Sequence, residues 1–166
     1  MTTSNAAASE TRRVLTLLSE TPGTIARTAR GRSEDDLCRR PEVEAWSAQE
    51  IVAHLRACAE VWGRSIDRML AEDHPTIRYV SPRGWIRKTD YLRQTFRENL
   101  KAFSAQREVL MTTLTPLTAN GWRRGATFTG TTSGREGTVL IYASRIAEHE
   151  VRHLDQLSRT LKSVTG

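Results

Sequence analysis

Residues 46–55 read WSAQEIVAHL and begin a long amphipathic helix. Ser47 is a favourable N-cap residue, and Glu50 three positions later completes the pattern of a capping box. Pro75 disfavours helical backbone at the residue before it, so this helix is predicted to end near Glu72. Its apolar residues recur at the spacing of one helix face and are Ile51, Leu55, Trp62, Ile66, Met69 and Leu70.

Three further helices are predicted around this one. The first covers about Ser9–Arg30, with a kink or a division into two shorter helices at Pro22, which lacks a backbone donor. The third covers about Thr89–Leu114. The fourth begins after an N-cap at Thr138 and runs to about Lys162.

The stretch Thr118–Gly137 differs from the helical segments because it is rich in glycine and threonine. We expect an ordered crossover loop with a short strand there. Four long helices and one long crossover predict a single all-α domain over residues 1–166, a four-helix bundle. Residues 1–8 are expected to be a flexible N-terminus. The glycines of the crossover are Gly121, Gly125, Gly130 and Gly134.

The chain has 166 residues and a net charge of +6, but its arginines are scattered and no Lys/Arg run exceeds two residues. This pattern favours a solvated basic surface over a nucleic-acid interface. No window approaches a membrane span, and the start lacks the apolar core of a secretory signal, so we expect a cytoplasmic protein. The two cysteines, Cys38 and Cys58, do not form a zinc-knuckle pattern.

Residues 147–157 read AEHEVRHLDQL and carry two histidines four positions apart. His149 and His153 therefore stand one above the other on a helix, where the apolar stripe meets the polar face. His54 can supply a third imidazole from the helix that begins at Ser47. Three protein ligands leave an open coordination position, which is typical of a catalytic metal site. The alternative is that each histidine simply lies at the edge of the core.

WSAQEIVAHL resembles the Trp-Ser-x-x-Glu-x-x-x-His-Leu signature of the DinB/YfiT-like superfamily. The fourth helix of that family ends in His-x-x-x-His-x-x-Gln, which His149, His153 and Gln156 match. The segments TPGTIARTA and DHPTI also follow the family's order, so the resemblance covers essentially the whole chain. It implies an up-down-down-up bundle and a divalent metal, nickel or zinc, held by His54, His149 and His153.

The resemblance implies two kinds of reaction, thiol S-transfer with a low-molecular-weight thiol and metal-dependent hydrolysis. A metal ion suits both, because it lowers the pKa of bound water and binds a thiol as thiolate. We expect a small-molecule electrophile or thiol as substrate, with Arg145, Arg152 and Gln156 as candidate catalytic residues. The alternative interpretation of the two arginines is that they are ordinary surface cations. A metal-binding or stress-response bundle without turnover is the alternative, and a basic nucleic-acid-binding protein is less favoured.

Other polar residues have simpler interpretations. Cys58 follows His54 by one helical turn and could approach a metal, although a free cysteine on an apolar face usually belongs to the core. His74 is expected at the surface. Glu148 and Glu150 flank His149 in sequence but point elsewhere on the helical wheel, so a role as base is a weaker alternative.

Two tryptophans and one helix face have predicted packing roles. Trp46 is expected to pack at the start of its helix, and Trp122 to pack the crossover down. A homodimer is expected, because Phe96, Phe103 and Leu110 give the third helix an apolar face that looks only half covered.

Overall fold

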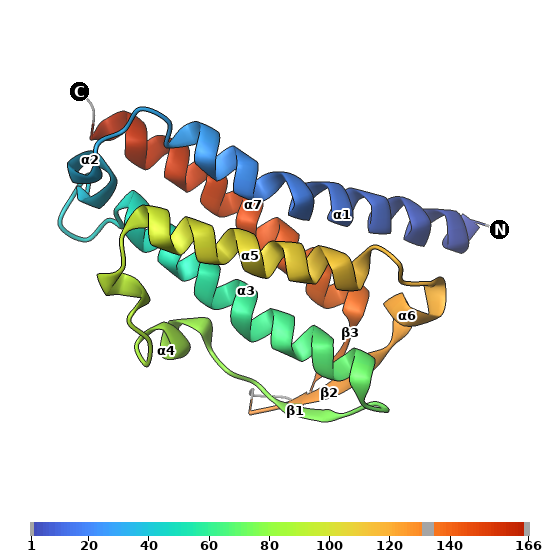
Figure 1. The fold of residues 1–166 in the computed structure, drawn as a ribbon. Helices are drawn as coiled ribbons and strands as arrows, with labels where there is room; N and C mark the ends of the chain where they lie inside the picture. Colours follow the sequence, from blue (N-terminus) through green and yellow to red (C-terminus); the bar gives the residue numbers. More distant parts are fainter. Residues whose placement is uncertain (1, 131–134, 165–166) are drawn as a thin grey trace.

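Four long helices form the body of the protein (Figure 1). The computed structural model describes residues 2–130 and 135–164. In Figure 1, α1 and α7 run in one direction and α3 and α5 run in the opposite direction, which confirms the up-down-down-up bundle. The long helices are α1 (Thr2–Thr28), α3 (Ala48–Ala71), α5 (Phe96–Leu114) and α7 (Val139–Ser163).

Shorter elements occupy the connections. The strands form a small sheet in the order β1-β2-β3, in which β1 and β2 are parallel and β2 and β3 are antiparallel. The crossover Thr118–Gly137 thus holds a helix and two strands; Gly134 lies outside the described residues. The short elements are α2 (Glu34–Cys38), β1 (Thr76–Arg78), α4 (Pro82–Ile86), the 3-10 helix η1 (Tyr91–Arg93), α6 (Ala119–Arg123), β2 (Gly125–Thr129) and β3 (Arg135–Thr138).

Side-chain caps set the helix boundaries. The backbone N–H of Glu50 donates to Ser47 Oγ at 3.2 Å, and that of Ser47 donates to Glu50 Oε2 at 2.8 Å, which confirms the predicted capping box. The third long helix begins at Phe96 instead of near Thr89, because Thr95 and Glu98 form a second capping box that the sequence analysis missed.

Helix α1 is longer than predicted and is not divided. It begins at Thr2 instead of near Ser9, so helical backbone covers most of the stretch that was expected to be flexible. Pro22 lies inside the helix, which continues to Thr28. The ribbon bends in this part of α1 (Figure 1), as expected where a proline removes one backbone hydrogen bond.

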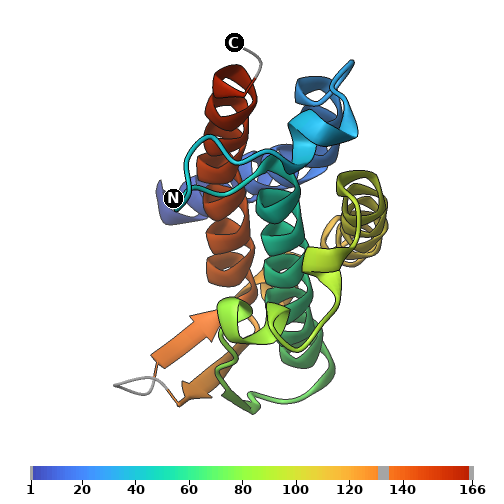
Figure 2. The same cartoon turned by 90° about the vertical axis from the view of Figure 1, so that its left-hand side faces the viewer.

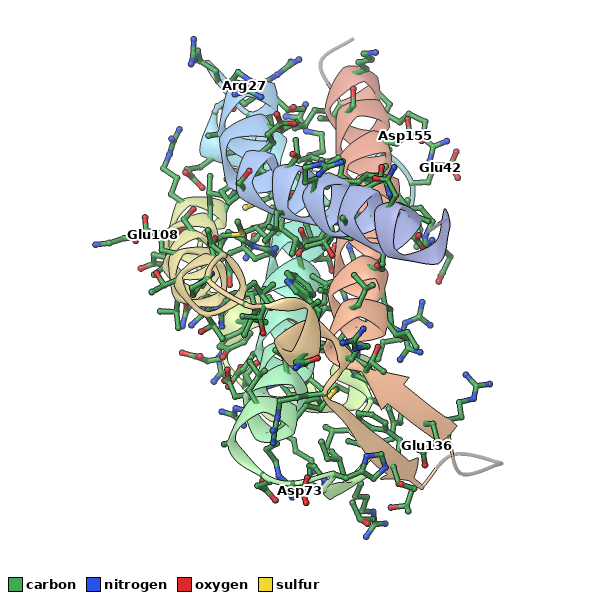
Figure 3. The ribbon with its side chains drawn as sticks, turned by 90° about the vertical axis from the view of Figure 1, so that its right-hand side faces the viewer. Arg27, Glu42, Asp73, Glu108, Glu136 and Asp155 are labelled. Carbon is green, nitrogen blue, oxygen red and sulfur yellow. The ribbon has the colours of Figure 1, made fainter. Side chains whose placement is uncertain are left out.

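The core lies between the long helices, with α3 packed against both α5 and α7. Phe96, Phe103 and Leu110 are at most 7% exposed because they pack inside the chain, so a homodimer would need a different surface. Charged side chains cover the outside; Figure 3 shows those of Glu108 and Asp155 pointing away from the bundle. No helix within residues 2–130 and 135–164 is long and apolar enough to cross a membrane.

The small sheet connects the C-terminal end of α3 to the N-terminal end of α7. Strand β1 follows α3 closely in the chain, and β3 ends at Thr138, whose side chain caps α7 as predicted. Trp122 is 6% exposed and anchors the crossover in the core, as expected. Figure 2 shows α3 and α7 lying side by side above this sheet.

Candidate metal centre

Helices α3 and α7 bring the three histidines to one place. His54 Nε2 lies 3.2 Å from His149 Nε2, and His153 Nε2 lies 3.1 Å from the same atom. One ligand atom from each of the three residues lies within 4.8 Å of the other two. The imidazoles predicted from the sequence to converge therefore do so.

The spacing of His149 Nε2 from each of the other two nitrogens fits a tetrahedral metal ion. Zinc–nitrogen bonds of about 2.0–2.1 Å place two ligands of a tetrahedron about 3.3 Å apart. The observed separations of 3.1 and 3.2 Å agree with that edge. The converging atom of each ring is the same, Nε2, so the donor set suits a cation that accepts three lone pairs.

The hydrogen bond of His153 orients its lone pair. His153 Nδ1 lies 2.8 Å from Gln156 Oε1, which can only accept, so Nδ1 carries the proton and Nε2 is free to bind a metal. His149 Nδ1 is buried and has no partner among the described protein atoms. Gln156, which the sequence predicts as a candidate catalytic residue, contacts His153 in the structure.

The surroundings of the cluster favour neutral imidazoles. Burial, followed by the charges of the neighbouring histidines and arginines, lowers the pKa of His54 to about 4 and that of His149 to about 3. Burial also lowers the pKa of His153, against the hydrogen bond to Gln156. A neutral imidazole is the form that binds a metal, so the rings are in the ligand state at neutral pH.

Two tryptophans hold the rings. Trp46 stacks on His153 with an interplanar angle of 5° and a centroid distance of 6.1 Å, and its centroid lies 5.0 Å from that of His54. Trp62 meets His149 edge-on at 5.0 Å. Trp46 lies at the start of its helix as predicted, and its contact with the histidines had no signal in the sequence.

Cys58 lies beside the nitrogen cluster. Its Sγ is 3.4 Å from His54 Nε2 and 4.0 Å from His149 Nε2, and the residue is 2% exposed. Burial raises the pKa of the thiol, and the charge of Glu150 raises it further. The side chain is therefore a protonated thiol in the absence of a metal, in keeping with a core cysteine.

The two candidate arginines lie on another side of α7. Arg145 packs its guanidinium over the Tyr142 ring at 4.8 Å. Arg145 and Arg152 both line a hollow between α7 and α1 that also contains Glu10 and Glu148. Of the two arginines, Arg152 is the one whose charge acts on the histidines, because it contributes to lowering the pKa of His149 and His153.

The remaining sequence candidates lie outside the cluster. His74 is exposed and its Nε2 lies 2.9 Å from a carboxylate oxygen of Glu136, as expected for a surface histidine. Glu148 pairs with Arg13 at 3.3 Å. Glu150 is buried and pairs with Arg107 on α5, so neither carboxylate acts as a base at the histidines.

A cation at the site was also missed. Arg83 on α4 places its guanidinium 5.9 Å from the centroid of the Trp46 ring, which stacks on His153. No sequence pattern indicated this, because α4 is a five-residue helix inside the connector that the sequence marks only with turn residues.

Comparison with known proteins gives one family and one fold. The family model of the DinB superfamily matches residues 17–157. A solved structure similar to this chain is that of YfiT from Bacillus subtilis, described as a probable metal-dependent hydrolase with an unusual four-helix bundle topology. The two chains are 19% identical with a TM-score of 0.70, over 90% of this chain and 86% of YfiT. No curated protein matches the sequence.

Proposed function

Since this chain belongs to the DinB superfamily, we propose that it is a metal-dependent enzyme that activates a thiol or a water molecule for attack on a small electrophile. The observation that carries the proposal is the convergence of three Nε2 atoms, from His54, His149 and His153. Three protein ligands leave one tetrahedral position for a reactant.

The protein's own residues have distinct roles in this proposal. His54, His149 and His153 hold the ion as neutral imidazoles. Gln156 accepts the Nδ1 proton of His153 and so keeps that ring in the metal-binding tautomer. The bound ion supplies positive charge that lowers the pKa of water or of a thiol.

Arg145, Arg152 and Gln156 remain the proposed catalytic candidates, with different support. Arg152 is the better placed of the two arginines, because its charge affects both His149 and His153. Arg145 rests on Tyr142 and would have to leave that ring to reach a reactant. Gln156 acts through His153, so it is a positioning residue in this structure.

The finer assignments rest on resemblance. Thiol S-transfer with a low-molecular-weight thiol is placed first, and hydrolysis is supported by the description of YfiT. Nickel and zinc are the proposed metals, since imidazole suits both. A cytoplasmic location and a homodimer also belong to the proposal.

The test begins with metal analysis of protein purified without a histidine tag. The protein is then assayed with a panel of electrophiles, with and without low-molecular-weight thiols, after loading with nickel or zinc. We expect metal-dependent turnover that His149→Ala abolishes and the surface variant His74→Ala retains. Confirmed metal occupancy without any thiol or water chemistry would reject the enzyme. Steep salt dependence of DNA binding would instead favour the nucleic-acid alternative.

A closed metal site without turnover is the second candidate, and the position of Cys58 favours it. A thiolate ligand at about 2.3 Å and a nitrogen at about 2.0 Å subtend a tetrahedral edge of about 3.5 Å. Cys58 Sγ lies 3.4 Å from His54 Nε2 and 4.0 Å from His149 Nε2. The burial that raises the pKa of this thiol opposes ligation.

Cobalt substitution separates the open site from the closed one. A cobalt–thiolate charge-transfer band without added thiol, lost in Cys58→Ser, would show ligation by Cys58. The open site predicts no such band and unchanged metal affinity in Cys58→Ser.

A further inference from the structure

The chain that joins α3 to α5 runs back along α3 and leaves a cavity of about 200 Å³ against it. In Figure 1 this connector passes from β1 beneath α3 to α4. The cavity begins at Val61, two helical turns beyond His54 and so about 10 Å further along α3. None of the histidines of the metal centre lines it. It is therefore a separate feature of the molecule.

The floor and one wall of this cavity are apolar. Val61 of α3 and Ile77, the inward-facing residue of β1, are buried, and Val80 is 44% exposed beside them. Trp85 of α4 donates its only polar hydrogen to Glu60 Oε2 at 2.9 Å, so the rest of its ring presents apolar surface. A hydrocarbon group in the cavity would therefore be removed from water on several sides.

Three arginines also line the cavity, and no acidic residue does. Arg64 Nη2 lies 2.5 Å from Glu60 Oε1, and neither of these pairing atoms leaves the other charge uncompensated. Arg68 Nε lies 2.5 Å from Glu72 Oε1 in the same way. Arg78 makes no ion pair and no side-chain hydrogen bond in the part of the chain that the structure describes. One positive charge at the cavity is thus not compensated.

Arg64 keeps donors free as well. Its guanidinium lies over the Trp85 ring, 4.9 Å from the ring centroid, and this contact together with the pair to Glu60 holds it in place. Among the described residues only its Nη2 donates a hydrogen bond, so its other N–H groups have no protein acceptor. Guanidinium groups form strong, charge-assisted hydrogen bonds to the planar carboxylate group.

The size of the cavity limits the ligand. A volume of 200 Å³ equals that of about seven water molecules. We propose that the cavity is a binding site for a short-chain monocarboxylate of about six carbons. The hydrocarbon chain packs against Val61, Ile77 and Trp85, and the carboxylate binds Arg78 at the rim. This site is additional to the metal centre and does not rest on the proposed metal-dependent function.

The test uses protein from which metal has been removed by dialysis against a chelator, so that no carboxylate binds through a metal at the histidines. Hexanoate and hexanamide share a hydrocarbon chain and differ in charge, and each is titrated into ¹⁵N-labelled protein. The indole N–H signals of the four tryptophans are followed by NMR, and Trp85→Phe identifies the signal of Trp85. We expect that signal to shift, with a Kd about tenfold lower for hexanoate, as for one charge-assisted contact.

Variants of the lining residues locate the two halves of the site. Arg78→Gln should weaken hexanoate binding about tenfold and leave the Kd of hexanamide unchanged. Val80→Asp places a carboxylate on the exposed part of the apolar wall and should weaken both ligands, hexanoate the more. The matched control is Arg87→Gln, which removes an exposed cation that does not line the cavity and should have no effect.

Three results would overturn the site. Equal Kd values for hexanoate and hexanamide, or a preference that survives in Arg78→Gln, would remove the carboxylate contact. Shifts of the Trp46 and Trp62 signals without one of Trp85 would place the ligand at the histidine cluster, since those two rings contact the histidines. No saturable shift with hexanoate would reject the cavity as a binding site. A protein without metal-dependent turnover would still give the expected titration, because the two sites share no residue.

Discussion

His149 and Glu150 are neighbours in α7, and they enter two different polar clusters. About 100° apart around the helix axis, one points to the histidine cluster and the other to Arg107 on α5. The Arg107–Glu150 pair has side chains only 3% and 2% exposed. Burial raises the pKa of Glu150, and the Arg107 guanidinium opposes part of that rise.

The clusters differ in what completes them. Arg107 and Glu150 bring opposite charges, so each offsets part of the cost of burying the other. The histidine cluster brings together three imidazole nitrogens of the same kind, and none of the three supplies an opposite charge to the others. The first cluster pairs its two charges within the protein, although Arg107 Nε and Nη1 and Glu150 Oε2 have no hydrogen-bond partner among the described atoms. The second offers its nitrogens to a cation from solution.

The largest effect is expected from breaking the ion pair. Arg107→Ala leaves Glu150 buried without its partner and should lower the free energy of unfolding by about 3–5 kcal/mol. Urea denaturation at pH 7, in the presence of chelator, measures it. The double variant Arg107→Met/Glu150→Leu is the control and should recover most of the loss. A loss below about 1 kcal/mol in Arg107→Ala would mean that the pair is not the closed unit described above.

Breaking the histidine cluster should act through the metal. At a free metal concentration of one hundred times Kd, binding to the folded state should add about 2.7 kcal/mol to the free energy of unfolding. We expect His149→Ala to lose this increment, measured by urea denaturation with and without zinc. His74→Ala should retain it. Equal stabilisation of wild type and His149→Ala would remove His149 from the ligand set.

The histidine cluster should also make the stability of the metal-free protein depend on pH. The folded-state pKa values of about 4 for His54 and about 3 for His149 lie below the usual value of 6.5. At a pH between the folded-state and unfolded-state pKa values, these histidines bind more protons in the unfolded chain than in the folded protein. The free energy of unfolding therefore falls as the pH is lowered from about 6.5 to about 3. Above 6.5 these groups contribute no pH dependence.

We expect the two histidines together to lower the free energy of unfolding by about 2 kcal/mol, because solvent that reaches the partly exposed His149 reduces its share. Denaturation midpoints between pH 7 and pH 4, with chelator, provide the measurement. The variant His54→Asn/His149→Asn corrects for carboxylates elsewhere. An identical pH profile in that variant would contradict the assignment.

The smallest effect is expected at Gln156, which contacts the side of His153 that faces away from the other histidines. Gln156→Leu removes the acceptor for His153 Nδ1 and should weaken metal binding about tenfold, at the lower end for such supporting contacts. Gln156→Glu keeps an acceptor and should bind metal at least as tightly as wild type. Competition with a fluorescent chelator gives both affinities. Unchanged affinity in Gln156→Leu would show that the packing of His153 against Trp46 suffices to orient it.

Local patterns predicted the two helices that carry the histidines. Ser47 and Glu50 mark the start of α3, and Thr138 marks the start of α7, because caps act within four residues. The start of α5 was placed too early. Tyr91 and Leu92 continue the apolar pattern N-terminal to Thr95, although the chain there forms a separate 3-10 turn.

The site was predictable where one helix supplies the geometry. His149 and His153 follow from their spacing, His54 follows as a third imidazole from the helix that begins at Ser47, and the resemblance implies all three as ligands. The sequence analysis missed the ion pair, although Arg107 stands in the same helix stripe as Phe103 and Leu110, a position that indicates a buried charge. Arg83 left no such signal, since its place depends on how α4 packs on α3.

Thr138 ends β3 and also caps α7, so the number of residues between the sheet and the histidines of α7 is fixed. Thr138 pairs with Gly125 in the sheet and accepts from the Ile141 backbone in the helix. One residue inserted between Thr138 and His149 would turn His149 by about 100° and shift it about 1.5 Å along the axis. A length change in this segment should therefore dismantle the histidine cluster while leaving every ligand residue in the sequence.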